Sequence, residues 1–407
     1  MEDKGFTRRK FMELGCMLGA SALLGSLGGC SNEPVGSTIN EELLKLPLSR
    51  ENGRVLFGIY SDTHMRQICE EIVPRVSDMK WLSRGDSIFI KVASNSPNRH
   101  PATTSPRALK AIIGFLKDRG AGTIYVGDQS GTEFVRLTAD HREGSTRHVM
   151  KQNGLLTAAE TSGAQIHCFD DQGWDGYFRA ESDFDTTWKD NLFLPKILQK
   201  VDHIINLPRL GRHSIAGYTC GIKNAVGWLR DDSRRVLHLD GPTFFQKIAD
   251  INHFPIIRKK LRFTLTLADS ALLKIGPDFG GEYDFGGYLV LASSNLVDHD
   301  FLASSLLPWL DAHCPSPFGL YATYPKHINY WNRLVVKTTW GEESAEKCQF
   351  IKAYNYGESI AHDTLISHMA YLQKYRPAKI AVLKRGDNIP AAMMEHIERV
   401  GEGIFRV

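Results

Sequence analysis

The sequence predicts an α/β fold, with a mostly parallel sheet, helices on both of its faces, and inserted loops or lids. Two observations lead to this prediction. Short apolar runs rich in β-branched residues alternate with helical periods along most of the chain, and one segment has the pattern of a complete strand–helix–strand crossover. Continuous apolar strands of this kind are typical of sheets that are buried on both faces.

The crossover is the clearest unit. Its first strand is predicted at Ser87–Val92 and its second at Thr123–Gly127. Between them Ser105 stands as a helix N-cap before Pro106, and apolar residues at i, i+3, i+4 and i+7 from Leu109 form one helical face. A strand, a helix and a second strand in this order indicate a parallel pair.

The same alternation continues along the chain. Further strands are predicted at 55–60, 165–169, 203–207, 263–268, 288–292 and 379–383, and a further helix at 363–374. The segments 134–164 and 173–191 are predicted to be insertions or lids around the sheet.

The N-terminal residues have the features of an export signal. The pair Arg8 and Arg9 precedes an uncharged apolar stretch at 14–27, which is too short to span a bilayer, and small residues then precede Cys30. Their order predicts a twin-arginine signal peptide at 1–29, with Cys30 becoming the lipidated first residue of the mature chain. The alternative is a buried helix that begins with two arginines.

This signal predicts the organisation and location of the protein. Residues 30–50 would form a lipidated tether and residues 51–407 the α/β body, with a C-terminal α/β extension at about 311–407. Two acyl chains are enough for stable anchoring, so we expect a protein of the cell envelope that faces the periplasm or the exterior. Export in the folded state mildly favours a bound metal or cofactor.

Composition excludes several classes of protein. The chain has 407 residues, with 49 Lys and Arg against 46 Asp and Glu, and this near balance argues against nucleic acid as a partner. Its seven cysteines are widely spaced, which excludes Cys-x-x-Cys zinc sites and cysteine-clustered iron–sulfur binding. The signal peptide and lipidation account for two of them, and the other five are predicted to be structural thiols, with a reactive thiol at Cys220 as the alternative.

Polar side chains follow most of the predicted strands. In parallel sheets the carboxyl ends of the strands form the ligand-binding edge, so these residues are candidates for ligand binding. The set comprises Asn95, Asp128, Ser130, Arg212, Asn224 and Asn295. The same residue types are also ordinary helix caps and turn formers, and that interpretation stays open for each of them.

The densest polar stretch runs from 206 to 224. Arg212 supplies a fixed cation and His213 an imidazole that ordinarily titrates near neutral pH, and glycines allow a ligand close to the backbone. Lys223 and Asn224 follow within one helical turn of Thr219. The stretch indicates an anion site, with a solvated lysine and a helix cap as the alternative.

With these segments placed, the body resembles the domain of unknown function 362 family over about residues 85–310. The resemblance rests on Gly85-Asp86 before a strand that ends in Lys91, on Asn206-Leu207-Pro208, and above all on His213 with Gly217, Lys223 and Asn224. Asp269 and Gly276-Pro277 match later elements. Arg212 stands before His213 where the family usually has lysine, and the ferredoxin-type cysteines of some members are absent, so no iron–sulfur cluster is expected.

Two functions follow as hypotheses. The first is an enzyme acting on a small anionic substrate, in which Arg212 and Lys223 hold charge, His213 is a general acid or base, and Asp269 orients it or binds a metal. The second is a non-catalytic ligand- or metal-binding lipoprotein that serves a partner protein of the envelope or of redox chemistry.

A divalent metal is an open alternative in both cases. Asp62, His64 and Asp298 are ligands of suitable type. Asp62-Thr63-His64 also resembles the Asp-x-His that opens dinuclear metallophosphoesterases, although the later Asn-His and Gly-His-x-His elements of those enzymes are missing.

Overall fold

The computed structural model describes residues 43, 45–61, 64–213, 215–274, 276–314, 328–348, 364–377 and 379–401. The predicted signal peptide, Cys30 and Asp62 therefore lie outside the described residues. No helix in the described ranges is both long enough and apolar enough to span a bilayer.

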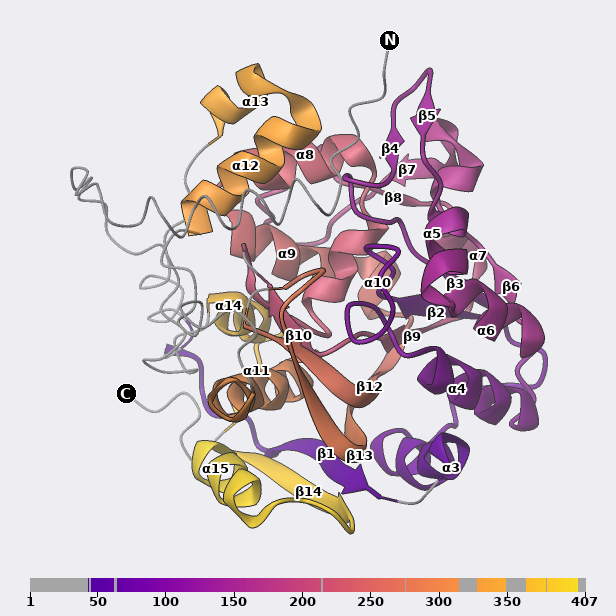
Figure 1. The fold of residues 1–407 in the computed structure, drawn as a ribbon, viewed down its shortest axis with the longest axis vertical. Coiled ribbons are helices and arrows are strands. Elements are labelled where there is room, and N and C mark those ends of the chain that lie inside the picture. The colour runs from indigo at the N-terminus through magenta and orange to yellow at the C-terminus, as the bar shows by residue number, and fades with distance from the viewer. Residues whose placement is uncertain are drawn as a thin grey trace.

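A large mixed sheet forms the centre of the molecule (Figure 1). Its strands lie in the order β14 (Ile380–Gly386), β1 (Gly53–Tyr60), β13 (Gly281–Ser293), β12 (Leu261–Leu273), β9 (His203–Leu207), β2 (Ile88–Val92), β3 (Ile124–Gly127) and β6 (Gln165–Ile166). β13 runs antiparallel to β1 and β12, and the other neighbours along this path are parallel. The predicted, mostly parallel sheet is confirmed.

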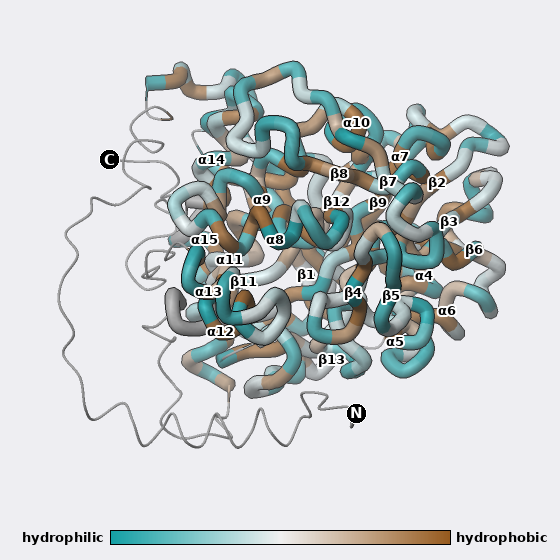
Figure 2. Tube along the Cα trace, turned by 90° about the horizontal axis from the view of Figure 1, so that it is seen from above, coloured by the Kyte–Doolittle hydropathy of each residue, from teal (hydrophilic) through white to brown (hydrophobic). Residues whose placement is uncertain are grey.

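Helices cover both faces of this sheet. On one side lie α3 (Met65–Val76), α4 (Pro106–Asp118), α5 (Thr146–Asn153) and α6 (Leu155–Thr161), and on the other α9 (Phe244–His253), α11 (Leu296–His313), α14 (Thr364–Leu372) and α15 (Ala391–Gly401). Successive residues of β13 alternate between the two cores: Leu289 and Leu291 pack on the second side, and Val290 and Ala292 on the first. Figure 2 shows apolar segments inside and polar segments outside.

The helix of the crossover forms as predicted, because its local signals agree with its packing. The Ser105 hydroxyl accepts a hydrogen bond from the Ala108 backbone N–H, and Pro106 occupies the first turn. Leu109, Ile112 and their neighbours on the same stripe are buried against the sheet. Burying each such side chain contributes roughly 1.5–3 kcal/mol, which makes this stripe the main stabilisation of the helix.

The segments between the main strands hold shorter elements. They are β4 (Arg136–Leu137), β5 (Arg142–Glu143), η1 (Asp170–Gln172), η2 (Trp174–Gly176), β7 (Tyr177–Arg179), β8 (Phe193–Pro195), α7 (Ile197–Lys200), η3 (Lys223–Trp228), α8 (Asp231–Leu239), α10 (Pro255–Arg258), α12 (Ile328–Trp340) and α13 (Glu342–Lys347). Within the predicted insertion at 134–164, α5 and α6 pack on the sheet.

β12 and β13 are longer than predicted. They form a hairpin whose strands continue well past the predicted ends at 268 and 288, so that Leu273 pairs with Gly281. Two consequences concern the site. Asp269 lies within β12 and not after its end, and the glycine-rich tract around Gly276 forms the turn of the hairpin.

A small second hairpin branches from β12. β10 (Gly211–His213) pairs with β11 (Gly217–Thr219), and Gly211 lies beside Leu272 of β12. A Cβ atom on Gly211 would come within 2.6 Å of the Leu272 carbonyl oxygen, so glycine is required for this close approach. The hairpin carries His213 to the tip of the β12–β13 turn.

Candidate functional site

Five titratable side chains meet beyond the carboxyl ends of β3 and β9. We call Glu133, Arg209, His213, Lys223 and Asp278 the central charge cluster. Each of them interacts electrostatically with at least one other member. All except Arg209 keep part of their surface accessible, so water reaches the cluster.

Arg209 and Asp278 form the buried side of the cluster. Arg209 is only 2% exposed, and its Nη1 donates to the Pro101 carbonyl oxygen at 3.4 Å. Burial lowers the Arg209 pKa to about 10, and the charge of Asp278 opposes this shift. Asp278 is held by the Asn95 side-chain amide, which donates to its carboxylate at 2.6 Å, and by Asn98, which donates to its backbone oxygen.

Lys223 is the member with the most unusual environment. Burial, and then repulsion by Arg209 and Arg234, lower the pKa of Lys223 from 10.5 to about 7, with Asp278 opposing the shift. Among the described residues, no hydrogen bond or ion pair reaches its ammonium group. A lysine with this pKa exists in both protonation states at neutral pH, which suits either proton transfer or the capture of an anion.

The backbone around Lys223 is fixed on both sides. Before it, the Gly221 and Ile222 N–H groups donate to Asp300 at 2.8 and 2.7 Å. After it, the Asn224 side-chain amide donates to the Lys91 carbonyl oxygen at 3.1 Å and to Asn206 at 2.8 Å. Lys223 therefore stands on a rigid support while its own side chain reaches the cluster.

His213 is held in one tautomer. Its Nδ1 accepts hydrogen bonds from the backbone N–H groups of Ile215 and Ala216, at 3.1 and 3.2 Å. The neutral ring must then carry its proton on Nε2. Burial, followed by the charges of Lys223 and Arg209, lowers the His213 pKa well below its ordinary value. Near neutral pH His213 is thus a hydrogen-bond donor, whereas Lys223 and Glu133, each with a pKa of about 7, are the members of the cluster that titrate.

Glu133 stands at the accessible side of the cluster. Burial of its carboxyl group, and then the charge of Asp278, raise the Glu133 pKa above its ordinary value. The residue as a whole still keeps an exposed surface. The cluster thus comprises two cationic groups, one neutral imidazole donor and two carboxyl groups.

A buried ion pair between Lys91 and Asp128 belongs to the framework beside the cluster. Lys91 is 1% exposed and lies 2.7 Å from Asp128, whose other carboxylate oxygen accepts from the Ser94 N–H at 2.6 Å. The Ser130 hydroxyl donates to the Ser94 carbonyl oxygen at 2.6 Å, and Asn224 joins the same network. The predicted ligand residues Asp128, Ser130 and Asn224 are therefore brought together, but as parts of a buried framework.

The remaining predicted residues lie elsewhere. Asp269 pairs with His100 at 2.8 Å and with Arg107 at 3.7 Å, so it does not orient His213 as we expected, because β12 continues past it. Arg212 donates to Asp311 at 2.5 Å on the far side of its strand from the cluster. Asn295 caps α11 by accepting from the Val297 N–H at 2.7 Å.

The predicted metal ligands do not converge. His64 is the exposed N-cap of α3, just after β1 ends, while Asp298 accepts from the Arg54 N–H at the beginning of β1. At about 3.3 Å per residue, these two ends of the strand are roughly 20 Å apart. Asp298 also accepts from the Tyr375 hydroxyl at 2.9 Å, and burial raises its pKa to about 6.

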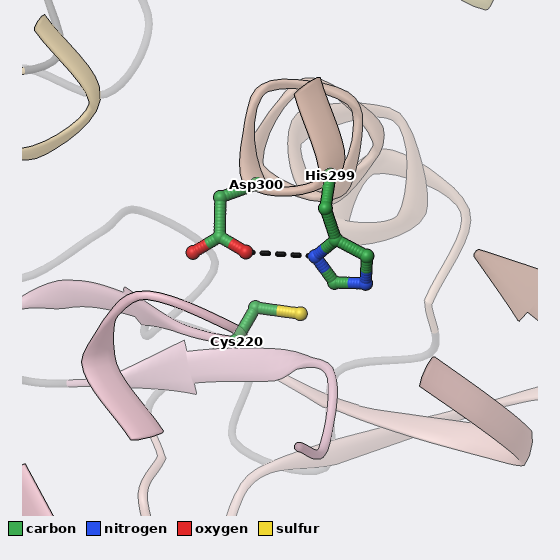
Figure 3. Close-up of side chains that lie close together, drawn as sticks. All are labelled: Cys220, His299 and Asp300. Carbon is green, nitrogen blue, oxygen red and sulfur yellow. Dashed lines mark hydrogen bonds and ion pairs between the residues drawn. The ribbon is translucent and has the colours of Figure 1, made fainter. Parts of the chain in front are cut away.

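Another group has the chemistry of a metal site. In the described part of the chain, Cys220, His299 and Asp300 place their ligand atoms within 4.8 Å of one another (Figure 3). Each of these atoms already has a partner. His299 Nδ1 donates to Asp300 at 2.8 Å, Thr266 bridges His299 Nε2 and the Cys220 sulfur, and Asp300 holds the two backbone N–H groups before Lys223. These residues fit a hydrogen-bonded positioning network better than they fit an ion.

Cys220 is also a poor candidate for a reactive thiol. It is fully buried, and burial, together with the nearby charge of Asp300, raises its pKa well above the ordinary value. The thiol stays protonated and shares a hydrogen bond with the Thr266 hydroxyl, which fits the predicted structural thiol and argues against the reactive alternative.

A family model described as a domain of unknown function, DUF362, matches residues 88–305. The chain belongs to this family. The match covers the central charge cluster, the Lys91–Asp128 pair and Asp300.

Two known proteins are similar to this family member. A thylakoid-associated protein of Synechocystis sp. is 24% identical over 245 residues, which cover 58% of this chain and 67% of that protein. The structure of the lactate racemase apoprotein from Thermoanaerobacterium thermosaccharolyticum covers 88% of each chain with 10% identity and a TM-score of 0.37. At this identity and TM-score, the second likeness gives no information about chemistry.

Several residues of the cluster carry no sequence pattern of their own. Glu133 lies in a predicted insertion and Asp278 in a glycine-rich tract that reads as a turn. Lys91 does leave a signal, because it is a lysine at a buried position inside the apolar run Ile88–Val92. A cation in a strand that is covered on both faces requires a buried counter-ion.

Proposed function

We propose that this protein is an enzyme that acts on a small anionic substrate at the central charge cluster. The observation that carries this proposal is Lys223: an ammonium group beside Arg209, without an ion-pair partner among the described residues, and with a pKa of about 7. A bound anion would compensate both cations.

The cluster divides the roles of its side chains. Arg209 is a permanent cation that attracts the anion, and the His213 Nε2–H can donate a hydrogen bond to it. Lys223 in its neutral form is a base of suitable strength for proton abstraction near neutral pH, and in its charged form an acid. The carboxyl groups of Asp278 and Glu133 restrict how an anion can be oriented beside the cations.

The lowered pKa of Lys223 can be tested without knowing the substrate. Competitive labelling of lysines with acetic anhydride, read by mass spectrometry across pH 5–11, should give Lys223 a half-labelling pH near 7. Exposed Lys151 serves as the reference lysine in the same experiment. Millimolar phosphate or small carboxylates should protect Lys223 and raise its titration pH, because an anion stabilises the ammonium form. Titration of Lys223 above pH 10, with no protection, contradicts the proposal.

Catalysis is separated from simple binding by a second measurement on the same protein. Proton NMR in D2O, with a panel of small organic acids and phosphate esters, detects abstraction of a substrate C–H proton, because deuterium from the solvent then replaces that hydrogen. Turnover that falls at least 100-fold in Lys223→Met, and not in Lys151→Met, supports the enzyme. Protection of Lys223 by members of a panel that show no turnover favours the alternative, a ligand-binding lipoprotein that serves a partner.

We also propose that the chain is exported by the twin-arginine route and anchored by lipid at Cys30, in the cell envelope, with its body facing the periplasm or the exterior. Arg8, Arg9 and the small residues before Cys30 support this proposal. Cys30→Ala should move the mature protein from the membrane fraction to the soluble fraction. Arg8→Lys with Arg9→Lys should leave the uncleaved precursor in the cytoplasm. Unchanged fractionation and processing in both variants would refute the anchor and the route.

A further inference from the structure

A second cationic site lies away from the central charge cluster, at the surface between α3 and α4. A cavity of about 460 Å³ opens there, near the first turns of both helices. Arg66, Arg107, Lys110 and His64 line it together with Tyr288, and no acidic residue lines it in the described part of the chain. Its volume is in the range of small-molecule sites.

The cations differ in how strongly they are already paired. Arg66 already forms two ion pairs: its Nε lies 3.0 Å from Glu70, and its guanidinium also contacts Asp118. Arg107 is held loosely, at 3.7 Å from Asp269, and its Nη1 donates to the Tyr288 hydroxyl at 3.4 Å. For Lys110, no ion pair or hydrogen bond occurs in the described ranges. Arg107 and Lys110 can therefore turn to a ligand without breaking a strong contact.

The placement of these charges is locally unfavourable. The positive end of a helix dipole disfavours cations, and yet Arg107 and Lys110 stand at the beginning of α4, which has no acidic residue in its first turn. α3 begins at the same cavity, likewise without an acidic residue in its first turn and with no side-chain cap. An anion in the cavity would offset the repulsion at both helix ends. Natural proteins keep such unfavourable placements of charge mainly at functional sites.

The lining indicates the chemistry of the anion. A planar guanidinium, an ammonium, an imidazole and a phenol hydroxyl together match the several oxygens of a phosphate group. Met65, Ala111 and the ring of Tyr288 provide apolar surface beside them, which suits an organic group on the phosphate. From this geometry we infer that the cavity binds a phosphate ester, independently of the proposed reaction at Lys223. The ester can be a soluble molecule or a phospholipid headgroup.

The test uses the full chain with Cys30→Ala, so that no lipid anchor contributes to membrane binding. Glycerol 3-phosphate binding is measured by isothermal titration at constant ionic strength. We expect Arg107→Gln with Lys110→Gln to weaken binding at least 10-fold, and Lys151→Gln to leave it unchanged. The same comparison in a Lys223→Met background removes any contribution of the central charge cluster to the measured binding, and the effect of the double substitution should persist there.

A second arm separates the two sources of phosphate. Co-sedimentation with phosphatidylglycerol vesicles, compared with phosphatidylcholine vesicles, should be lost in the double variant if the headgroup is the ligand. Binding of the soluble ester without vesicle binding assigns a soluble phosphate ester. The inference is overturned if neither probe binds, or if the double variant binds both as the unsubstituted protein does. Circular dichroism shows whether the exposed helix positions tolerate the substitutions.

Discussion

Replacing Asp128 with alanine is expected to lower the free energy of unfolding by about 3–5 kcal/mol. The substitution leaves Lys91 buried at 1% exposure without its counter-ion. It also removes the acceptor of the Ser94 N–H, which has no access to water. Burial already lowers the pKa of Lys91, and Asp128 is the strongest group that opposes this shift. Urea denaturation followed by circular dichroism measures the change.

Two further variants show whether the cause is the uncompensated charge. Asp190→Ala removes the carboxylate of an exposed pair with Arg179, where less than about 1 kcal/mol is expected. Lys91→Met combined with Asp128→Ala removes the buried ammonium as well, and should recover part of the loss. If Asp128→Ala costs no more than Asp190→Ala, the ion pair does not hold the framework together.

Replacing Asp300 with alanine should cost a similar amount, about 3–5 kcal/mol, and should also disturb Lys223. Asp300 is fully buried and accepts hydrogen bonds from the Gly221 and Ile222 N–H groups, the Tyr218 hydroxyl and His299 Nδ1. Each buried N–H left without an acceptor costs about 1–3 kcal/mol. The same two N–H groups fix the segment that enters η3, so Lys223 should titrate closer to an ordinary lysine in the variant. Denaturation and lysine labelling measure the two effects.

Asp298→Asn is the matched control for positioning. Asp298 is buried on the same helix and also accepts a backbone N–H, but from Arg54 in β1 and not from the segment that precedes Lys223. We expect it to reduce stability while leaving the Lys223 titration near pH 7. An equal change of Lys223 labelling in both variants would show that general loosening, and not the Asp300 contacts, sets its environment.

Most of the sheet could be predicted because its strands are locally unambiguous. The strand at 203–207 was predicted with the bounds that β9 has, and the helix after Ser105 formed with the predicted cap and stripe. Continuous apolar runs specify burial on two faces wherever they occur in a chain. The predicted hairpin is too short, because a bulge between Ala268 and Ser270 interrupts β12 and because Gly281, Glu282 and Asp284 on the facing strand are residues typical of loops.

The site was only partly predictable. His213 and Lys223 were found from their spacing and residue types, and the structure places them in electrostatic contact. Asp269 was chosen because a strand seemed to end before it, and it lies beside Arg107 instead. Arg209, Asp278 and Glu133 are separated by long stretches of chain, and no local pattern connects them.

The sequence by itself determined the α/β class, the order of the main elements and the family, because periodicity and short motifs are local properties. Only the tertiary structure decided which charges face one another. The Lys223 pKa is near 7 because burial, and then the nearby charges of Arg209 and Arg234, disfavour its ammonium form. Asp128 is paired with Lys91, and Asp300 accepts from backbone N–H groups. Electrostatic energy depends on distance through space and on burial, and neither can be read from positions along a chain.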